Sequence, residues 1–273
     1  MNGPIAQLAA LTCHGNAFLG GRDFPAFFPS NSTCRFCDRI EFVEFEANAK
    51  GDQIRKTLAA NPDAWIHELP IREVDGLRLL FGARNDPHIS DRMSAGFAGG
   101  GHVWTLEVKR DDGLSEYWSP DWSVWNADAP DRRIWRVSYR LTLTKPSEPY
   151  KGRNLAIVKQ TFRESLTEIQ EFSERHTQGI FAQHFADALA SLDDPGADVG
   201  YHKDIAVPGQ LNADAESLLK ASMCAWVFGG MGSWNDMGFA QPIQTEYENE
   251  SDKLFDVIHE AIEASIASTF LTS

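Results

Sequence analysis

The cysteines are the residues of this chain whose types and spacing most suggest chemistry. Cys34 and Cys37 form a Cys-x-x-Cys pair, and Cys13 stands next to His14. Two thiolates on one turn can face a single ion, and a structural zinc ion takes four cysteine or histidine ligands in a tetrahedron. One hypothesis is therefore a structural zinc site formed by Cys13, Cys34, Cys37 and His14.

Other interpretations of the cysteines stay open. The spacing does not fix the fourth ligand, and His67, His88 or His102 are alternatives to His14. The thiols can equally be small, buried, unliganded groups. A redox dithiol is a third interpretation, although such a pair normally opens a helix, whereas Cys37 leads into a predicted strand. Four cysteines in 273 residues are too few for a disulfide framework.

A glycine-rich loop at residues 229–236, Gly-Gly-Met-Gly-Ser-Trp-Asn-Asp, follows an apolar helical pattern. Loops that a rigid helix positions often carry binding and catalytic groups. We take Ser233 and Asp236 as candidate catalytic residues and Trp234 and Asn235 as candidate ligand contacts. Ser233 would need a histidine as base, and the spacing selects none of its candidates, which are His176, His184, His202 and His259. The alternative is a structural helix stop, with Trp234 packed back onto the helix.

A second glycine-rich loop, residues 95–102, precedes a strand. Phosphate-binding loops follow a strand and open a helix, so this order argues against a nucleotide loop. His88 and His102 flank the loop and are candidates for an acid–base pair. The alternative is a plain surface connection.

Tryptophans crowd the segment that follows. Trp118, Trp122 and Trp125 are candidate ligand contacts, because closely spaced aromatic rings can stack on a sugar or a peptide. Nucleotide stacking normally comes with a basic groove. The alternative is that the indole rings fill the core between a sheet and helices.

Strand patterns dominate the elements that must position these residues in the first half. Residues 39–46, 102–108 and 134–143 alternate apolar and polar side chains, the period of a half-buried strand. Further strands are expected at 64–69 and 77–81, and a short helix at 52–60 that Pro62 stops. We predict an N-terminal antiparallel β-sheet of about five to six strands, with one face on a core.

Beyond residues 145–149 the apolar period becomes helical. Leu155, Val158, Phe162, Leu166, Ile169 and Phe172 form one stripe. Gly179 is expected to break this helix, and further helices are expected at about 180–192, 214–228 and from 251 onward. Strands followed by helices predict an α+β fold, with a β-rich half at 1–150 and a helical half of about four helices at 151–273. We expect one continuous globular unit.

The net charge of −14 and the pI near 5.0 argue against a nucleic-acid partner, which needs a basic face, and against an anionic membrane surface. Residues 1–150 hold 17 basic and 20 acidic residues, whereas residues 151–273 hold 8 and 19. Most of the acidity therefore lies in the helical half. The sequence shows no signal peptide and no run long enough to span a membrane, so we expect a soluble, cytoplasmic protein.

These observations favour a non-enzymatic accessory or binding protein, inhibitor- or immunity-like, whose acidic helical half faces a basic protein partner. A hydrolase that uses the loop 229–236 and a histidine is the second hypothesis. A carbohydrate- or peptide-binding module built on the tryptophans is the third. The oligomeric state stays open.

Overall fold

The structure is a computed structural model that describes residues 1–47, 52–97 and 99–270. The described elements, in chain order, are α1 (Gly3–Leu19), η1 (Ser32–Cys34), β1 (Cys37–Ala47), β2 (Gln53–Ala59), α2 (Pro62–Ile71), β3 (Val74–Gly82), α3 (Asp91–Ser94), β4 (Val103–Arg110), β5 (Leu114–Val124), β6 (Trp135–Pro146), α4 (Leu155–His176), α5 (Ala182–Asp193), α6 (Ala213–Cys224), η2 (Trp234–Asp236) and α7 (Ile243–Ala267).

The sheet has six strands in the order β2-β1-β6-β5-β4-β3. Neighbouring strands are antiparallel except for β1 and β6, which run parallel with Ile40 opposite Val137 and Phe42 opposite Tyr139. The prediction of an α+β fold is confirmed, but the sheet is mixed and not purely antiparallel. The parallel pair joins strands almost a hundred residues apart, a pairing that a strand-by-strand pattern does not reveal.

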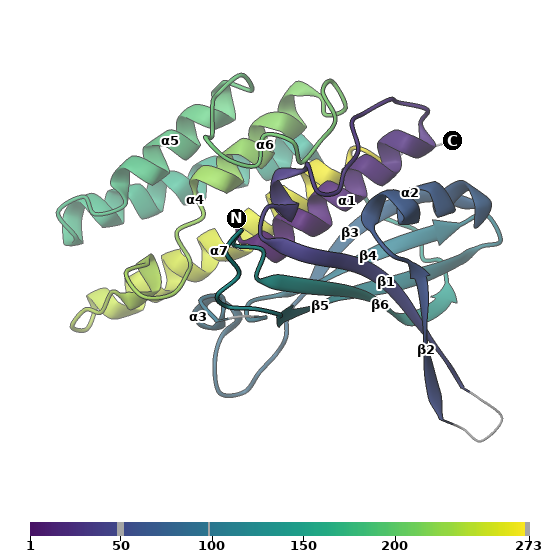
Figure 1. The fold of residues 1–273 in the computed structure, drawn as a ribbon. Coiled ribbons are helices and arrows are strands. Elements are labelled where there is room, and N and C mark those ends of the chain that lie inside the picture. The colour runs from purple at the N-terminus through teal and green to yellow at the C-terminus, as the bar shows by residue number, and fades with distance from the viewer. Residues whose placement is uncertain (48–51, 98, 271–273) are drawn as a thin grey trace.

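Helices cover one face of the sheet in two layers (Figure 1). In the inner layer, α1 and α7 lie side by side and both contact β3, while α2 packs on β1 and β2. In the outer layer, α4 and α6 pack against α7, and α5 packs against α4 and α6. The core cluster includes residues from both halves of the chain, among them Leu8, Trp118, Phe162 and Ile258.

The four helices expected in residues 151–273 are present as α4 to α7, but the described residues contain seven α-helices, because α1, α2 and α3 lie in the first half. The first, α1, begins after the N-cap Asn2, whose side chain accepts from the Ile5 N–H. Its residues from Ile5 to Ala17 are all buried. A helix that is buried all round shows no polar face, so it has no amphipathic stripe by which a sequence pattern identifies it.

Two predicted elements exchange their types. Residues 53–59 form strand β2, not a helix, and residues 62–71 form helix α2, not a strand. The Asn61 side chain accepts from the Ala64 N–H, and Pro62 takes the first turn. Proline is favoured there because its missing N–H has no partner in the first turn anyway. Pro62 therefore starts a helix, whereas the sequence interpretation used it as a stop.

The helical half follows its predicted order with shifted ends. The break near Gly179 is present between α4 and α5. Helix α6 ends at Cys224 and not near Phe228, so Gly229 and Gly230 do not cap it. Helix α7 starts at Ile243, eight residues before the predicted start at Ser251. In the part of the chain that the structure describes, no helix is long and apolar enough to cross a membrane.

Candidate functional site

The proposed zinc ligands do not form a common site. Burial raises the pKa of Cys34 to about 12 and that of Cys37 to about 11. Burial also raises the pKa of Cys13, which hydrogen-bonds to Thr269, and His14 uses Nδ1 on the Ala10 carbonyl at 2.9 Å. Among residues 1–47, 52–97 and 99–270, no group of three or more His, Cys, Asp or Glu side chains could hold a metal ion. The described geometry therefore gives no support to the four-ligand zinc hypothesis, which stays a prediction.

The tryptophans named as ligand contacts lie in different environments. Trp118 is fully buried on the core side of β5. Trp122 is half-buried, and its ring meets Trp135 edge-on with centroids 5.9 Å apart. Trp125 is exposed, and the Arg136 guanidinium lies 3.1 Å from its ring centroid. The three indoles are thus split between the core, its edge and the surface.

The side chains of Ser233 and Asp236 bind backbone groups of their own loop, 229–236. Ser233 donates its hydroxyl to the Gly229 carbonyl at 2.9 Å and accepts from the Asn235 N–H. Asp236 accepts from the Gly232 N–H. These are turn and cap contacts, in which a side chain replaces a missing backbone partner. The geometry assigns Ser233 and Asp236 to folding the loop.

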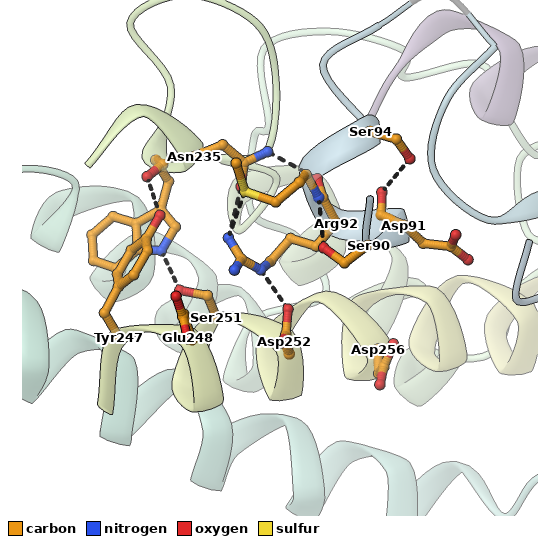
Figure 2. Close-up of polar contacts among 12 residues, drawn as sticks. Ser90, Asp91, Arg92, Ser94, Asn235, Tyr247, Glu248, Ser251, Asp252 and Asp256 are labelled. Carbon is orange, nitrogen blue, oxygen red and sulfur yellow. Dashed lines mark hydrogen bonds and ion pairs between the residues drawn. The ribbon is translucent and has the colours of Figure 1, made fainter. Parts of the chain in front are cut away.

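Trp234 and Asn235 anchor this loop to two other elements. Trp234 is fully buried, and its indole N–H donates to Ser251 of α7 at 2.7 Å. Asn235 binds Arg92 of α3 twice: it accepts from Nη1 at 3.0 Å and donates to the Arg92 carbonyl at 2.9 Å. Figure 2 shows Arg92 reaching from α3 towards Asn235 on one side and α7 on the other.

Arg92 is the centre of this junction. Its side chain is 5% exposed, its Nε lies 2.5 Å from Asp252 of α7, and its guanidinium lies 5.5 Å from the centre of the Tyr247 ring. The Tyr247 hydroxyl in turn donates to the Trp234 carbonyl at 2.7 Å. A buried guanidinium requires such partners because burying an unpaired charge is costly.

His102, a predicted acid–base candidate, bridges two carboxylates. Its Nδ1 lies 2.6 Å from Asp91 and its Nε2 lies 3.3 Å from Asp256. Burial opposes the charged imidazolium, but the hydrogen bonds to Asp256 and Asp91 outweigh it and raise the pKa of His102. His88, its predicted partner, is exposed, and the backbone N–H of His88 donates to the Asp86 side chain. Both ring nitrogens of His102 therefore serve to tie α3 to α7.

His259 lies beside His102, but its pKa is shifted in the opposite direction. The two ring centres are 4.6 Å apart, and the His259 ring is also packed against Trp104 and Phe255. Burial lowers the pKa of His259 to about 3, so the ring is neutral at pH 7. Its Nδ1 lies 2.6 Å from the Phe255 carbonyl, which fixes the ring orientation.

The two glycine-rich loops touch each other. A Cβ added at Gly96 would lie 2.3 Å from the Gly229 carbonyl oxygen, so only glycine permits this approach. The next apolar residues along each loop point into solvent: Phe97 is 69% exposed and Met231 is fully exposed. Ala98, also part of the predicted loop, lies outside the described residues.

A row of carboxylates on α7 borders these loops. Glu248, Asp252 and Asp256 are exposed and follow one another at four-residue steps, which places them on one side of the helix (Figure 2). Arg92 and His102 connect the last two to α3. We call Met93, Phe97, Met231, Glu248, Asp252 and Asp256 the loop–helix surface.

Sequence reasoning missed Arg92, Asp252 and Asp256. Helix α3 has only four residues, too few for a periodic pattern. The acidic row was readable as residues i, i+4 and i+8, but its first member lies before the predicted start of α7.

Comparisons with known proteins add no functional information. No family model matches the sequence, no curated protein matches it, and no solved structure matches the fold.

Proposed function

We propose that the protein binds a basic, amphipathic segment of a protein partner at the loop–helix surface. The observation that carries this proposal is a surface that combines apolar and acidic side chains. Phe97 and Met231 are exposed on adjoining glycine loops, and the carboxylates of α7 border these loops. Large apolar side chains are rarely left in solvent without a binding role when they are grouped. Methionine suits such a surface because its flexible side chain adapts to different partners.

The charge of the surface selects the partner. Asp252 is 53% exposed and Asp256 is 65% exposed although Arg92 and His102 contact them, and Glu248 accepts a hydrogen bond from the uncharged Gln244. A helix with apolar residues on one face and Lys or Arg beside them matches both features. Rim charges of this kind mainly speed association and fix orientation.

A designed amphipathic peptide of leucine and lysine, carrying a fluorescent label, tests the proposal by anisotropy at low and high salt. We expect saturable binding that weakens as salt rises, because the ionic contacts are screened. Met231→Ser and Glu248→Lys should each weaken binding by roughly fivefold to tenfold, about 1 kcal/mol.

Matched controls lie on α4. Ile157 is exposed like Met231, and Glu164 accepts from Gln160 as Glu248 accepts from Gln244. Ile157→Ser and Glu164→Lys should leave peptide binding unchanged. Equal losses in test and control variants would place the binding elsewhere, and no binding at all would remove the proposal.

A further inference from the structure

A serine, a histidine and an aspartate meet at a corner outside the loop–helix surface. The Ser32 hydroxyl lies 3.0 Å from Nδ1 of His202 and also contacts the Asp204 carboxylate. The second Asp204 oxygen accepts from the Ser32 N–H at 2.7 Å. The chain thus brings together three side chains of the nucleophile, base and acid types across 170 residues.

The corner is held rigidly. The Asn31 side-chain amide donates to the Asp204 carbonyl at 2.8 Å, and the Asn31 side-chain oxygen accepts from the Thr33 N–H at 3.0 Å and from the Thr33 hydroxyl at 2.6 Å. His202 has a φ of +50°, a left-handed conformation that few non-glycine residues adopt. Such strained residues cluster at functional sites, where the surrounding structure holds them in place.

The Ser32 hydroxyl has one proton and two acceptors within reach. Burial lowers the pKa of His202, so its imidazole is neutral at pH 7 and can accept a proton. Asp204 fixes the serine through its backbone and its hydroxyl together. A hydroxyl next to a neutral histidine is the arrangement in which serine becomes a nucleophile.

His202 also lines a cavity of about 530 Å³. Most of the wall is apolar and includes Ile205, Val207, Leu211, Leu219 and Met223. Two ion pairs, Lys203–Asp198 and Lys220–Glu216, lie in the same wall. A pocket that combines apolar side chains with polar groups and a histidine of shifted pKa is typical of a small-molecule site.

We propose that Ser32 is an acyl-accepting nucleophile, with His202 as its base, for carboxylic esters whose apolar acyl chain fits this cavity. The hydroxyl oxygen attacks the ester carbonyl carbon, and its proton passes to His202 Nδ1. The bond to the leaving alcohol then breaks, and His202 returns the proton to the alcohol oxygen. Water attacks the acyl-serine, gives a proton to His202, and releases the carboxylic acid as the proton returns to Ser32.

The Ser32 N–H is bonded to Asp204 and so does not point at the carbonyl oxygen of the ester. Lys203 follows His202 in the chain and lines the cavity, but its ammonium is paired with Asp198 at 2.8 Å, so the proposal rests on Ser32 and His202.

An alkyl fluorophosphonate with a reporter tag tests the nucleophile in the full chain. Attack by Ser32 forms a P–O bond and expels fluoride, while the proton goes to His202. We expect one adduct, which peptide mass spectrometry maps to Ser32, and slow hydrolysis of p-nitrophenyl butyrate. His202→Asn should reduce both rates at least about a hundredfold, the usual contribution of a general base. Asparagine is chosen because it tolerates the left-handed backbone.

Ser233→Ala is the matched control, since Ser233 also lies beside an aspartate of its own loop; it should leave labelling unchanged. Labelling of the unmodified protein needs no variant to fold, so absence of an adduct at Ser32 overturns the proposal. An adduct that forms equally fast with His202→Asn, or that maps to Ser233, overturns it as well.

Discussion

The loop 229–236 and the corner at Ser32 both place a serine beside an aspartate, but their contacts differ in range. Ser233 and Asp236 bind backbone groups of their own loop, within four residues. Ser32 binds His202 and Asp204, about 170 residues further along the chain. Local contacts shape a turn, whereas long-range contacts bring different chemical groups to one point. The range of its contacts therefore separates the structural serine from the candidate nucleophile.

The loop 229–236 is itself divided between anchor and exposed tip. Trp234 is fully buried, whereas Met231, three residues earlier, is fully exposed. The free energy of unfolding of variants at Trp234 and Met231 tests whether one part of the loop anchors it and the other does not.

Trp234→Ala should have the largest effect. It removes a fully buried indole and its hydrogen bond to Ser251, so we expect a loss of about 3–5 kcal/mol in the free energy of unfolding. Met231→Ala should change that free energy by less than about 0.5 kcal/mol. Urea unfolding followed by circular dichroism measures both, and comparable losses for the two variants would contradict the division.

Lowering the pH should reduce the free energy of unfolding, because His259 is buried in its neutral form. Its folded pKa of about 3 lies below the unfolded value near 6.5, so between these values the unfolded chain binds the extra proton and stability falls as pH falls. The loss is up to about 1.4 kcal/mol per pH unit. His259→Phe, which keeps an aromatic ring without titrating, should flatten the dependence from about pH 6.5 to about pH 4.5.

His102 works in the opposite direction. Its folded pKa is raised, so its bridge to Asp91 and Asp256 contributes fully below the unfolded pKa and is lost as pH rises through the folded one. Urea unfolding at several pH values, with His102→Gln as the second variant, separates the two histidines. If the free energy of unfolding falls equally steeply with pH in the wild type and in His259→Phe, His259 is not the group that causes the loss of stability in acid.

Gly96→Ala tests the contact between the two glycine loops and should lower the free energy of unfolding by about 1–2 kcal/mol, less than Trp234→Ala does. The added Cβ would meet the Gly229 carbonyl, which belongs to backbone and cannot rotate away. Gly82→Ala is the control, because a Cβ there meets nothing within 4 Å. If Gly96→Ala is as neutral as Gly82→Ala, the loops do not pack as described.

The amphipathic helix α4 was predictable because its stripe from Val158 to Phe172 is buried on one side and polar on the other. Helix α1 was not predictable, because the burial of all its sides depends on the elements that pack around it. The strand at 53–59 and the helix at 62–71 were not predictable either, because Pro62 can end one helix or begin another. His102 was identified as a candidate from its loop, but its partner Asp256 lies 154 residues away. Ser32 was not predictable as a site residue, because its partners His202 and Asp204 lie about 170 residues away in the chain. Its one local signal was the Asn-Ser-Thr run that caps η1.

The central position of α1 bears on how the protein is made. This helix is synthesised before the elements that cover it, which are β3, β4 and α7. Strand β1 likewise waits for β6 before its second edge is paired. Such long-range closure slows folding and leaves apolar surface open during synthesis. We therefore expect the nascent chain to depend on chaperones until α7 has emerged.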